Sequence, residues 1–368
     1  MKAAWKLLGS LSLAWVASVS SAATAESESV LRGSELSEQA ALVACDPESL
    51  IADDQVMGTA YEEDRADAWD DSCDIACGEF CNYCCPPTWK VRAGAVILTR
   101  EQSDEGMLAI LLGGLTQISG EEDFNFGYTA GPDVSIERVL GNGPNSVELR
   151  YFGALEWTSQ VEYGNTGDIQ IGPINIPLAF DVAGNYLSRL NSTEINFRHQ
   201  QSDRVTWLTG LRIIELHEEL SYDVDFIVPN LTGVNWNTDN HMYGAQAGAD
   251  VQMWRLSGPL SVNGIFKAGI YGNDADNSFT YDVLGTPIIR GNANDNPVAF
   301  VGEIGITSSC QVTRHFAVRG GYQLLWISEV ALAGDQAQLA LNTLDVDAIN
   351  SSGNVFYHGA LVGGEFTW

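Results

Sequence analysis

The sequence predicts an all-β protein, in which strands run up and down and close into a barrel that spans a membrane. Two observations support this prediction. From Trp89 onward, ten segments alternate apolar and polar residues with a period of two, which is the pattern of a strand with one apolar face. Their connections alternate strictly between short and long, as in an up-and-down barrel with short turns at one rim. We expect ten antiparallel strands, with eight or twelve as the alternatives.

The first 25 residues have the features of an export signal. Lys2 and Lys6 precede an apolar run, and the segment closes on the small residues Ala23 and Ala25. The apolar run is too short to span a bilayer as a helix. We therefore expect residues 1–25 to be a cleaved Sec signal peptide.

Residues 26–87 are predicted to form an acidic periplasmic extension that is largely disordered. They contain sixteen Asp and Glu residues against two Arg. They also contain few β-branched or aromatic residues, so they cannot bury much apolar surface. A domain boundary is expected at residue 88, where the alternating segments of residues 88–368 begin.

Cysteines crowd the end of this extension. An exported chain favours disulfides between them, or with the cysteine near the end of the eighth segment. Because seven cysteines leave one unpaired in a monomer, a disulfide to another envelope protein is the second interpretation. Zinc bound by thiolates is the third, and we predict no metal site. The disulfide candidates are Cys73, Cys77, Cys81, Cys84, Cys85 and Cys310.

The ten predicted strands follow in order along the barrel domain. They lie at residues 89–100, 134–140, 148–157, 194–199, 204–214, 242–254, 260–270, 298–307, 316–326 and 354–368. The short connections read GNGPN, QQSD, LSGP and QVTRH, and the long ones have roughly 20 to 30 residues. We place the short turns on the periplasmic side and the long loops outside.

Each segment has an apolar face and a polar face. In the first, Trp89, Val91 and Ala93 alternate with Lys90 and Arg92. Segments of about 10 residues match tilted strands that cross a hydrocarbon layer. In water the apolar faces would need a cover, and the sequence offers no amphipathic helix to provide one.

The polar faces predict a charged barrel interior. With equal numbers of acids and bases, we expect ion pairs across the lumen and not a filter of one sign. A barrel of this size can be filled by side chains. The apolar run of residues 106–115 would fold inward as a plug or form a helix at the rim. The expected lumen residues are Lys90, Arg92, Glu137, Glu148, Arg150, Glu156, Glu194, Arg198, Arg212, Asp250, Lys267, Glu303, Arg319 and Glu365.

The last segment keeps its alternation up to Trp368. We expect this strand to pair with the first and so close the barrel, since backbone groups in lipid must all be paired. Its aromatic end resembles the C-terminal signal of outer-membrane β-barrels. Phe366 and Trp368 would then be the residues read by the barrel-assembly machinery.

Several features together resemble the β-barrel porins of planctomycete-type bacteria. These are the Cys-rich stretch before the first strand, WKVRAGAVILTR as that strand, ELRYFG as an early strand, and the aromatic end. The resemblance extends from Cys73 to Trp368 and supplies no catalytic or substrate residues. It implies an outer-membrane protein in contact with lipid, through which ions and small solutes pass.

The predicted function is passive: a porin-like or structural role, without enzymatic activity or a cofactor. The net charge of −30 excludes a nucleic-acid binder. The alternative is a protease similar to the omptins, which would use carboxylates and a histidine at the barrel mouth as general bases. Its candidate residues are two pairs that flank one long loop: Asp223 with Asp225, and Asp239 with His241.

Overall fold

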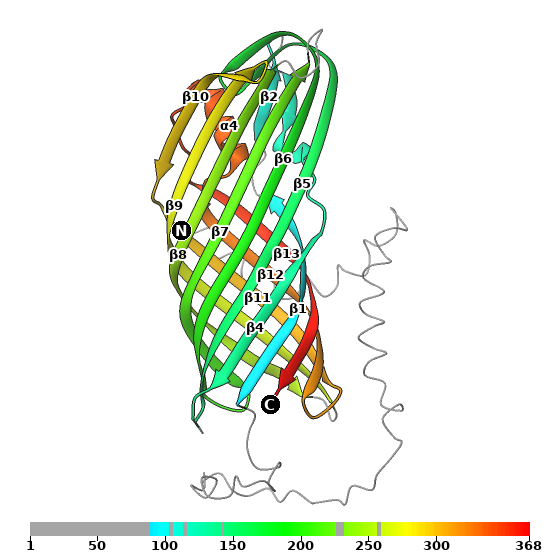
Figure 1. Ribbon diagram of the computed structural model, residues 1–368, viewed down its shortest axis with the longest axis vertical. Helices are drawn as coiled ribbons and strands as arrows, with labels where there is room; N and C mark the ends of the chain where they lie inside the picture. Colours follow the sequence, from blue (N-terminus) through cyan, green and yellow to red (C-terminus); the bar gives the residue numbers. More distant parts are fainter. Residues whose placement is uncertain (1–87, 103–105, 113–115, 142, 226–231, 256–258) are drawn as a thin grey trace, which may run out of the picture. The chain divides into compact units, whose positions relative to one another are not determined.

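The computed structural model describes residues 88–102, 106–112, 116–141, 143–225, 232–255 and 259–368. Ten antiparallel strands close into a barrel with short turns at its lower rim (Figure 1). The prediction of a ten-stranded up-and-down barrel is therefore confirmed. Around the ring, the strands are β1 (Trp89–Gln102), β4 (Thr129–Val139), β5 (Asn145–Ile171), β6 (Ile174–Gln200), β7 (Val205–Asp225), β8 (Thr232–Arg255), β9 (Leu260–Val283), β11 (Val298–Gln311), β12 (Phe316–Val330) and β13 (Gly353–Thr367).

The first and last strands close the ring, as the sequence predicts. β1 and β13 pair from Lys90 opposite Thr367 to Gln102 opposite Val355. The indole of Trp368 stacks on that of Trp89, with ring centroids 6.4 Å apart. The backbone N–H of Trp89 donates to the carbonyl of Trp368 at 2.9 Å. The end of β13 is therefore held by pairing and stacking, and the role of Phe366 and Trp368 in assembly stays a prediction.

Five strands are much longer than the sequence predicts. β5, β6, β7, β8 and β9 contain 27, 27, 21, 24 and 24 residues. Much of the expected external loops between these five strands continues the strands themselves, so the prediction of strands of about ten residues is wrong here. Figure 1 shows these strands rising beyond the upper ends of β1, β12 and β13.

The apolar face of the long strands changes side partway along. In β7, Leu211 and Ile213 face outward and are exposed, whereas Leu216 and Leu220 face inward and are buried. The change needs no irregularity, because apolar residues simply move from odd to even positions after Ile213.

The same change occurs at one level on the neighbouring strands. Tyr243 of β8 is exposed and the preceding Met242 is buried; Ile270 of β9 is exposed and the following Tyr271 is buried. Tyr243 lies opposite Ile213 in the β7–β8 register. We take this level as the outer edge of the membrane and call the parts on either side the membrane half and the outer half. In the membrane half, apolar residues face lipid; in the outer half, they face the interior.

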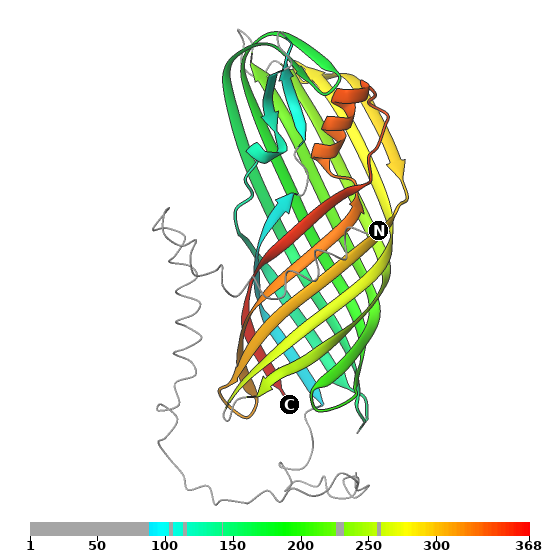
Figure 2. The ribbon, with the colours of Figure 1, turned by 180° about the vertical axis from the view of Figure 1, so that it is seen from behind.

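In the outer half, short elements cover the open side of the long strands. Figure 2 shows β2 (Met107–Leu111), β3 (Thr116–Gly120) and α4 (Ala333–Thr343) against the curved sheet that β10 (Thr286–Asp295) extends. The 3-10 turn η3 (Glu121–Asp123) follows β3. Among the described residues, no helix is both long and apolar enough to cross a membrane.

The apolar run after residue 106 is a strand of the interior. β2 pairs with β5, with Ala109 opposite Ile171, and Leu108 and Ala109 are fully buried. The run therefore folds inward, as the plug alternative predicts, and the expectation of a rim helix is wrong.

Candidate functional site: the interior of the barrel

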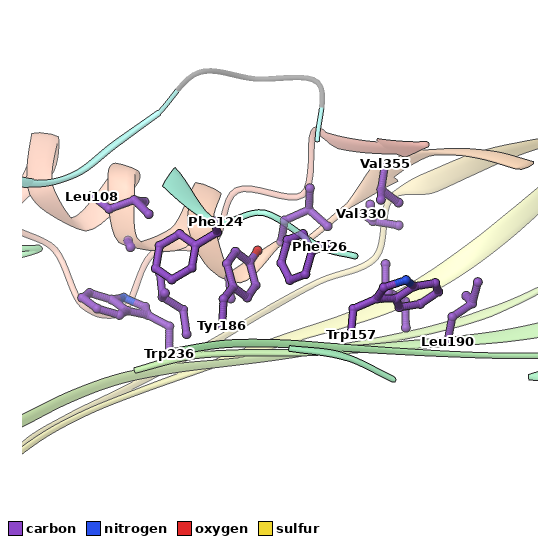
Figure 3. Packing of buried hydrophobic residues seen from close by; sticks show 14 of the residues in the cluster. Leu108, Phe124, Phe126, Trp157, Tyr186, Leu190, Trp236, Val330 and Val355 are labelled. Atoms are coloured by element: carbon purple, nitrogen blue, oxygen red, sulfur yellow. The ribbon is translucent and has the colours of Figure 1, made fainter. Parts of the chain in front are cut away.

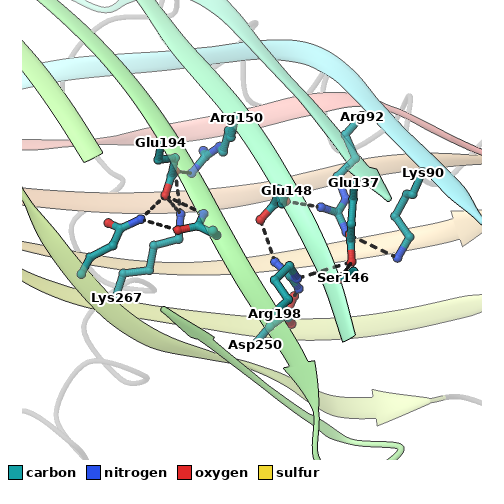
Figure 4. A network of polar contacts seen from close by, with 12 residues as sticks. Lys90, Arg92, Glu137, Ser146, Glu148, Arg150, Glu194, Arg198, Asp250 and Lys267 are labelled. Atoms are coloured by element: carbon teal, nitrogen blue, oxygen red, sulfur yellow. Dashed lines mark hydrogen bonds and ion pairs between the residues drawn. The ribbon is translucent and has the colours of Figure 1, made fainter. Parts of the chain in front are cut away.

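The lower part of the interior is crossed by ion pairs around Arg92. Its guanidinium donates to Glu365 at 2.9 Å, to Glu148 at 2.7 Å and to Glu137 at 3.3 Å. Arg198 donates to the other oxygen of Glu148 at 2.9 Å. Figure 4 shows this chain of alternating charges between β1, β4, β5 and β6.

A second group of ion pairs lies at the middle of the bore. Arg150 of β5 donates to Glu303 of β11 at 2.8 Å, and Arg212 of β7 donates to the second oxygen of Glu303 at 2.8 Å. Lys267 of β9 lies 2.8 Å from Glu194 of β6. All five side chains are almost completely buried, so each charge depends on its partner.

The Arg150–Glu303 pair shows how narrow the bore is. β5 and β11 are five places apart in the ring of ten strands, so they lie on opposite walls. A direct contact of 2.8 Å between their side chains therefore crosses the whole interior. At this level side chains of opposite walls bridge the bore.

A third pair begins the outer half. The guanidinium of Arg100 lies 2.5 Å from the carboxylate of Glu218, and both side chains are fully buried. The hydroxyl of Tyr186 donates to the other Glu218 oxygen at 2.7 Å. Burial, followed by the charge of Glu218, raises the pKa of Tyr186 well above its usual value. The hydroxyl therefore stays protonated and donates to Glu218, while its oxygen accepts the backbone N–H of Gly334 at 3.2 Å.

Above this pair most of the buried side chains are apolar. Phe124 and Phe126, after η3, pack edge-on against Tyr186 with ring centroids 5.5 and 5.2 Å away. Figure 3 shows these rings between the sheet and the inserted segments, with Trp236 and Trp157 in the same cluster. The outer half is thus filled by a core like that of a soluble protein, which excludes water.

The structure places most of the predicted lumen residues in the interior. Thirteen of the fourteen occupy inward positions; these are Lys90, Arg92, Glu137, Glu148, Arg150, Glu194, Arg198, Arg212, Asp250, Lys267, Glu303, Arg319 and Glu365. Sequence reasoning missed Asp133, which pairs with Arg150 at 2.9 Å. It also missed the Arg100–Glu218 pair, because Arg100 ends a segment and Glu218 falls in an expected loop.

Glu156 is the exception, and its predicted place in the lumen is wrong. It lies on the outer face, half exposed, and pairs there with Arg189 at 2.7 Å. The cause is a bulge in β5: the register with β6 shifts between Phe152 and Leu155, and Ala154 takes a left-handed φ of 51°. Such a bulge turns every later side chain to the opposite face.

Asn191 of β6 holds this bulge in place. Its side-chain oxygen accepts the backbone N–H of Ala154 at 2.9 Å and the hydroxyl of Tyr151 at 3.0 Å. Beyond the bulge, Leu155 and Trp157 face the interior and are buried. In β5 the bulge therefore turns the apolar residues inward. In β7, β8 and β9 the same change results from the position of the apolar residues in the sequence.

The structure does not bring the candidate protease residues together. Asp223, Asp225, Asp239 and His241 all lie on the outer face of the wall. Asp239 instead contacts His217 at 2.7 Å. Asp223 is six residues from His217 along β7, which is roughly 20 Å in an extended strand. These pairs therefore do not share one reaction site.

The ionisation of Asp223 tests whether the carboxylates on this outer face repel one another. Burial, then the nearby carboxylates of Asp282 and Asp225, raise the pKa of Asp223 above its usual value. The folded state therefore disfavours the ionised form. The resulting loss of folding stability is fully present above the pKa of Asp223 in the folded state. It disappears as the pH falls toward 3.8, the pKa of Asp223 in the unfolded state.

We therefore expect Asp223→Asn to stabilise the protein at about pH 7, by less than about 1 kcal/mol because solvent screens the site. The gain should shrink as the pH is lowered through the folded pKa, in urea unfolding monitored by tryptophan fluorescence. Ser221→Ala, an uncharged neighbour on the same face, controls for local packing. An equal gain for Asp223→Asn at every pH would contradict this cause.

The cysteine predictions fall mostly outside the described residues. Cys73, Cys77, Cys81, Cys84 and Cys85 are not among them, and Cys310 lies near the end of β11 with its side chain buried. The disulfides therefore stay predictions. In the described part of the chain, no three His, Cys, Asp or Glu side chains are grouped so as to hold a metal ion.

The fold and its interior define a class: a transmembrane β-barrel whose bore is filled by its own side chains. No protein-family model matches the sequence, and a comparison with curated proteins found no match. Solved structures with a similar fold include the outer membrane protease OmpT from Escherichia coli, with a TM-score of 0.42, 11% identity and coverage of 77% of this chain and 97% of that chain.

The comparison with solved structures also matched two other proteins. The translocator domain of the autotransporter NalP from Neisseria meningitidis has a TM-score of 0.40 and 11% identity, over 94% of this chain and 100% of that chain. The toluene transporter TodX from P. putida has a TM-score of 0.30 and 9% identity, over 77% and 91%. Similarities this low transfer no site, substrate or activity to this protein.

Proposed function

We propose that this protein is an outer-membrane barrel with a structural role in the cell envelope, closed to solutes and without enzymatic activity. The Arg150–Glu303 contact across the bore carries this proposal, because it joins opposite walls at 2.8 Å. The apolar outer belt of the membrane half supports a location in lipid, and the export signal expected in residues 1–25 supports the outer membrane.

The interior favours a structural role over the solute passage that the resemblance to planctomycete-type porins implies. A water-filled pore needs a polar lumen that side chains leave open. Here the charges are paired with one another in the membrane half, and the outer half is packed with apolar residues. Two successive barriers of different chemistry would have to open for an ion to pass.

Planar-bilayer recording tests this proposal. We expect no steady openings from the wild-type protein, whose folding is verified by heat-modifiable migration in a gel. The double variant Arg150→Ala with Glu303→Ala removes one charge of each sign from the middle of the bore, and a higher leak is expected from it than from the wild type. Glu156→Ala with Arg189→Ala removes an exposed pair on the outer face and serves as the matched control.

Steady wild-type conductance would overturn the closed barrel and favour a porin. Hydrolysis of peptides that is lost in both Asp239→Ala and His241→Ala would overturn the absence of enzymatic activity.

A further inference from the structure

An apolar groove crosses the lipid-facing surface of the membrane half. It has a volume of about 470 Å³, and small residues from three adjacent strands form its floor: Ala247, Ala268 and Gly302. These three lie side by side in register, Ala247 opposite Ala268 and Ala268 opposite Gly302. Large side chains around the floor make the walls; they include Trp207, Phe266, Ile304, Leu324, Trp326 and Phe356.

The groove runs obliquely toward the outer edge of the membrane. In Figure 2 the strands lean, so that β13 lies above β12, β11 and β9 in the membrane half. A row of paired residues from β8 to β13 therefore climbs outward. The upper end of the groove is at Trp326 and Phe356, which lie opposite each other on β12 and β13.

A hydrogen-bonded chain of three polar side chains adjoins this upper end. The hydroxyl of Tyr322 lies 2.5 Å from Nδ1 of His358, and Nε2 of His358 lies 3.0 Å from Glu101. The imidazole packs against Phe356 with ring centroids 5.7 Å apart. Glu101 lies opposite Phe356 in the β1–β13 register. The hydrogen-bonded side chains and the groove therefore have Phe356 in common.

The polarity of this chain favours a cationic ligand. In the tautomer in which Nε2 of His358 donates to the Glu101 carboxylate, Nδ1 accepts the hydroxyl of Tyr322. The oxygens of Glu101 and Tyr322 are then left only as acceptors for a ligand. The described Lys and Arg residues of β1, β12 and β13 all face inward, so none of them is placed to hold an anionic head group here.

We propose that this groove binds one aminophospholipid, with an acyl chain along the Ala247–Gly302 floor and the ammonium of the head group at Glu101 and Tyr322. The groove supplies apolar contact within the hydrocarbon layer, and the chain of polar side chains supplies acceptors near its edge. An aminophospholipid fits this position because Glu101 lies opposite Phe356 at the upper end of the groove, where the apolar floor has ended.

Native mass spectrometry of the full-length barrel tests the proposal. The protein is released from nanodiscs that contain equal amounts of phosphatidylethanolamine and phosphatidylglycerol with the same acyl chains. We expect the wild type to retain one phosphatidylethanolamine, in several-fold excess over phosphatidylglycerol. Equal retention of the two lipids would overturn the assignment of the head group.

Two kinds of variant separate the groove from the polar chain. Ala268→Leu fills the floor and should reduce retention of both lipids several-fold. Gly302→Val is a second filling variant, and the nearest atom to an added Cβ there is 3.6 Å away, so the strand can accept it. Glu101→Gln removes the charge but leaves the groove. Lipid should therefore still be retained, with the ratio of retained phosphatidylethanolamine to phosphatidylglycerol reduced toward one.

Matched controls lie elsewhere on the same outer surface. Ala93→Leu adds the same volume to an exposed position of β1, and Asp276→Asn removes a carboxylate from an exposed position of β9; both should behave as the wild type. Wild-type retention by Ala268→Leu and Gly302→Val would overturn the groove. Dimers that disappear in Ala268→Leu, without lipid retention in the wild type, would instead assign the groove to contact between two copies of this chain.

Discussion

Replacement of Glu303 by Gln is expected to destabilise the barrel by about 3–5 kcal/mol, because it leaves buried cations without their shared carboxylate. Glu303 is 1% exposed, and it binds Arg150 and Arg212 at 2.8 Å and lies 3.4 Å from Lys267. Gln has nearly the same shape, so the measured loss reports the charge and not a cavity. Urea unfolding in lipid vesicles, monitored by tryptophan fluorescence, gives the free energy of unfolding.

Glu156→Gln is the matched control for this prediction. Its carboxylate pairs with Arg189 at 2.7 Å, but both side chains are 50% exposed, and such pairs contribute about 0–1 kcal/mol. Adding Arg212→Met to Glu303→Gln removes one unpaired cation and should restore part of the stability. A Glu303→Gln barrel as stable as the Glu156→Gln barrel would show that the central ion pairs do not hold the walls together.

Trp157→Ala is expected to cost about 3–5 kcal/mol through loss of buried surface and a cavity in the outer half. Trp157 is 2% exposed, and its ring lies 5.0 Å from that of Tyr357. Its indole N–H donates to the carbonyl of Leu98 at 3.0 Å, so it also joins β5 to β1. Thermal unfolding of the two proteins in the same vesicles measures the difference.

Leu178→Ala serves as the control, since Leu178 lies on β6 in the outer half and is 78% exposed. A change at such a surface position is expected to stay within about 0.5 kcal/mol. Similar stabilities for Trp157→Ala and Leu178→Ala would mean that the core of the outer half adds little to the stability of the barrel.

The ten strands and their order could be predicted because the sequence repeats one simple physical requirement. Each strand of the membrane half needs apolar residues at every second position, and the last strand must pair with the first. The same alternation assigns the opposite face to the lumen, which is why Arg150, Arg212 and Glu303 could be placed there. Their partners could not be assigned, because alternation gives a face and no position around the ring.

Alternation predicts the wrong face for Glu156 because it cannot detect a bulge. Leu149, Leu155 and Trp157 occupy odd positions in the sequence and look like one continuous face. In the structure, Leu149 is exposed and the other two are buried, since the bulge at Ala154 lies between them. The one local signal is the Gly153-Ala154 pair of small residues opposite Asn191, which is too weak to predict a left-handed residue.

The sequence does not predict the length of the long strands, for a different reason. The alternation predicts strands surrounded by lipid, whereas β7, β8 and β9 continue into water, where the apolar face must turn inward. Adjacent apolar residues of opposite burial, Ile213 with Ile214 and Met242 with Tyr243, mark this change in the sequence. Pairs of apolar residues that are adjacent in sequence, at the same height on several strands, therefore indicate the edge of the membrane.

The unbroken strands also have a mechanical consequence. The backbone ladder between β7 and β8 runs without a register shift from Val205 opposite Val251 to Val224 opposite Thr232. β8 continues for eleven residues from Tyr243 to Thr232, which corresponds to roughly 25 to 30 Å of height for a tilted strand. With no hinge at the membrane surface, a sideways force on the outer end becomes a torque on the whole barrel. The protein should therefore behave as a rigid lever anchored in the bilayer.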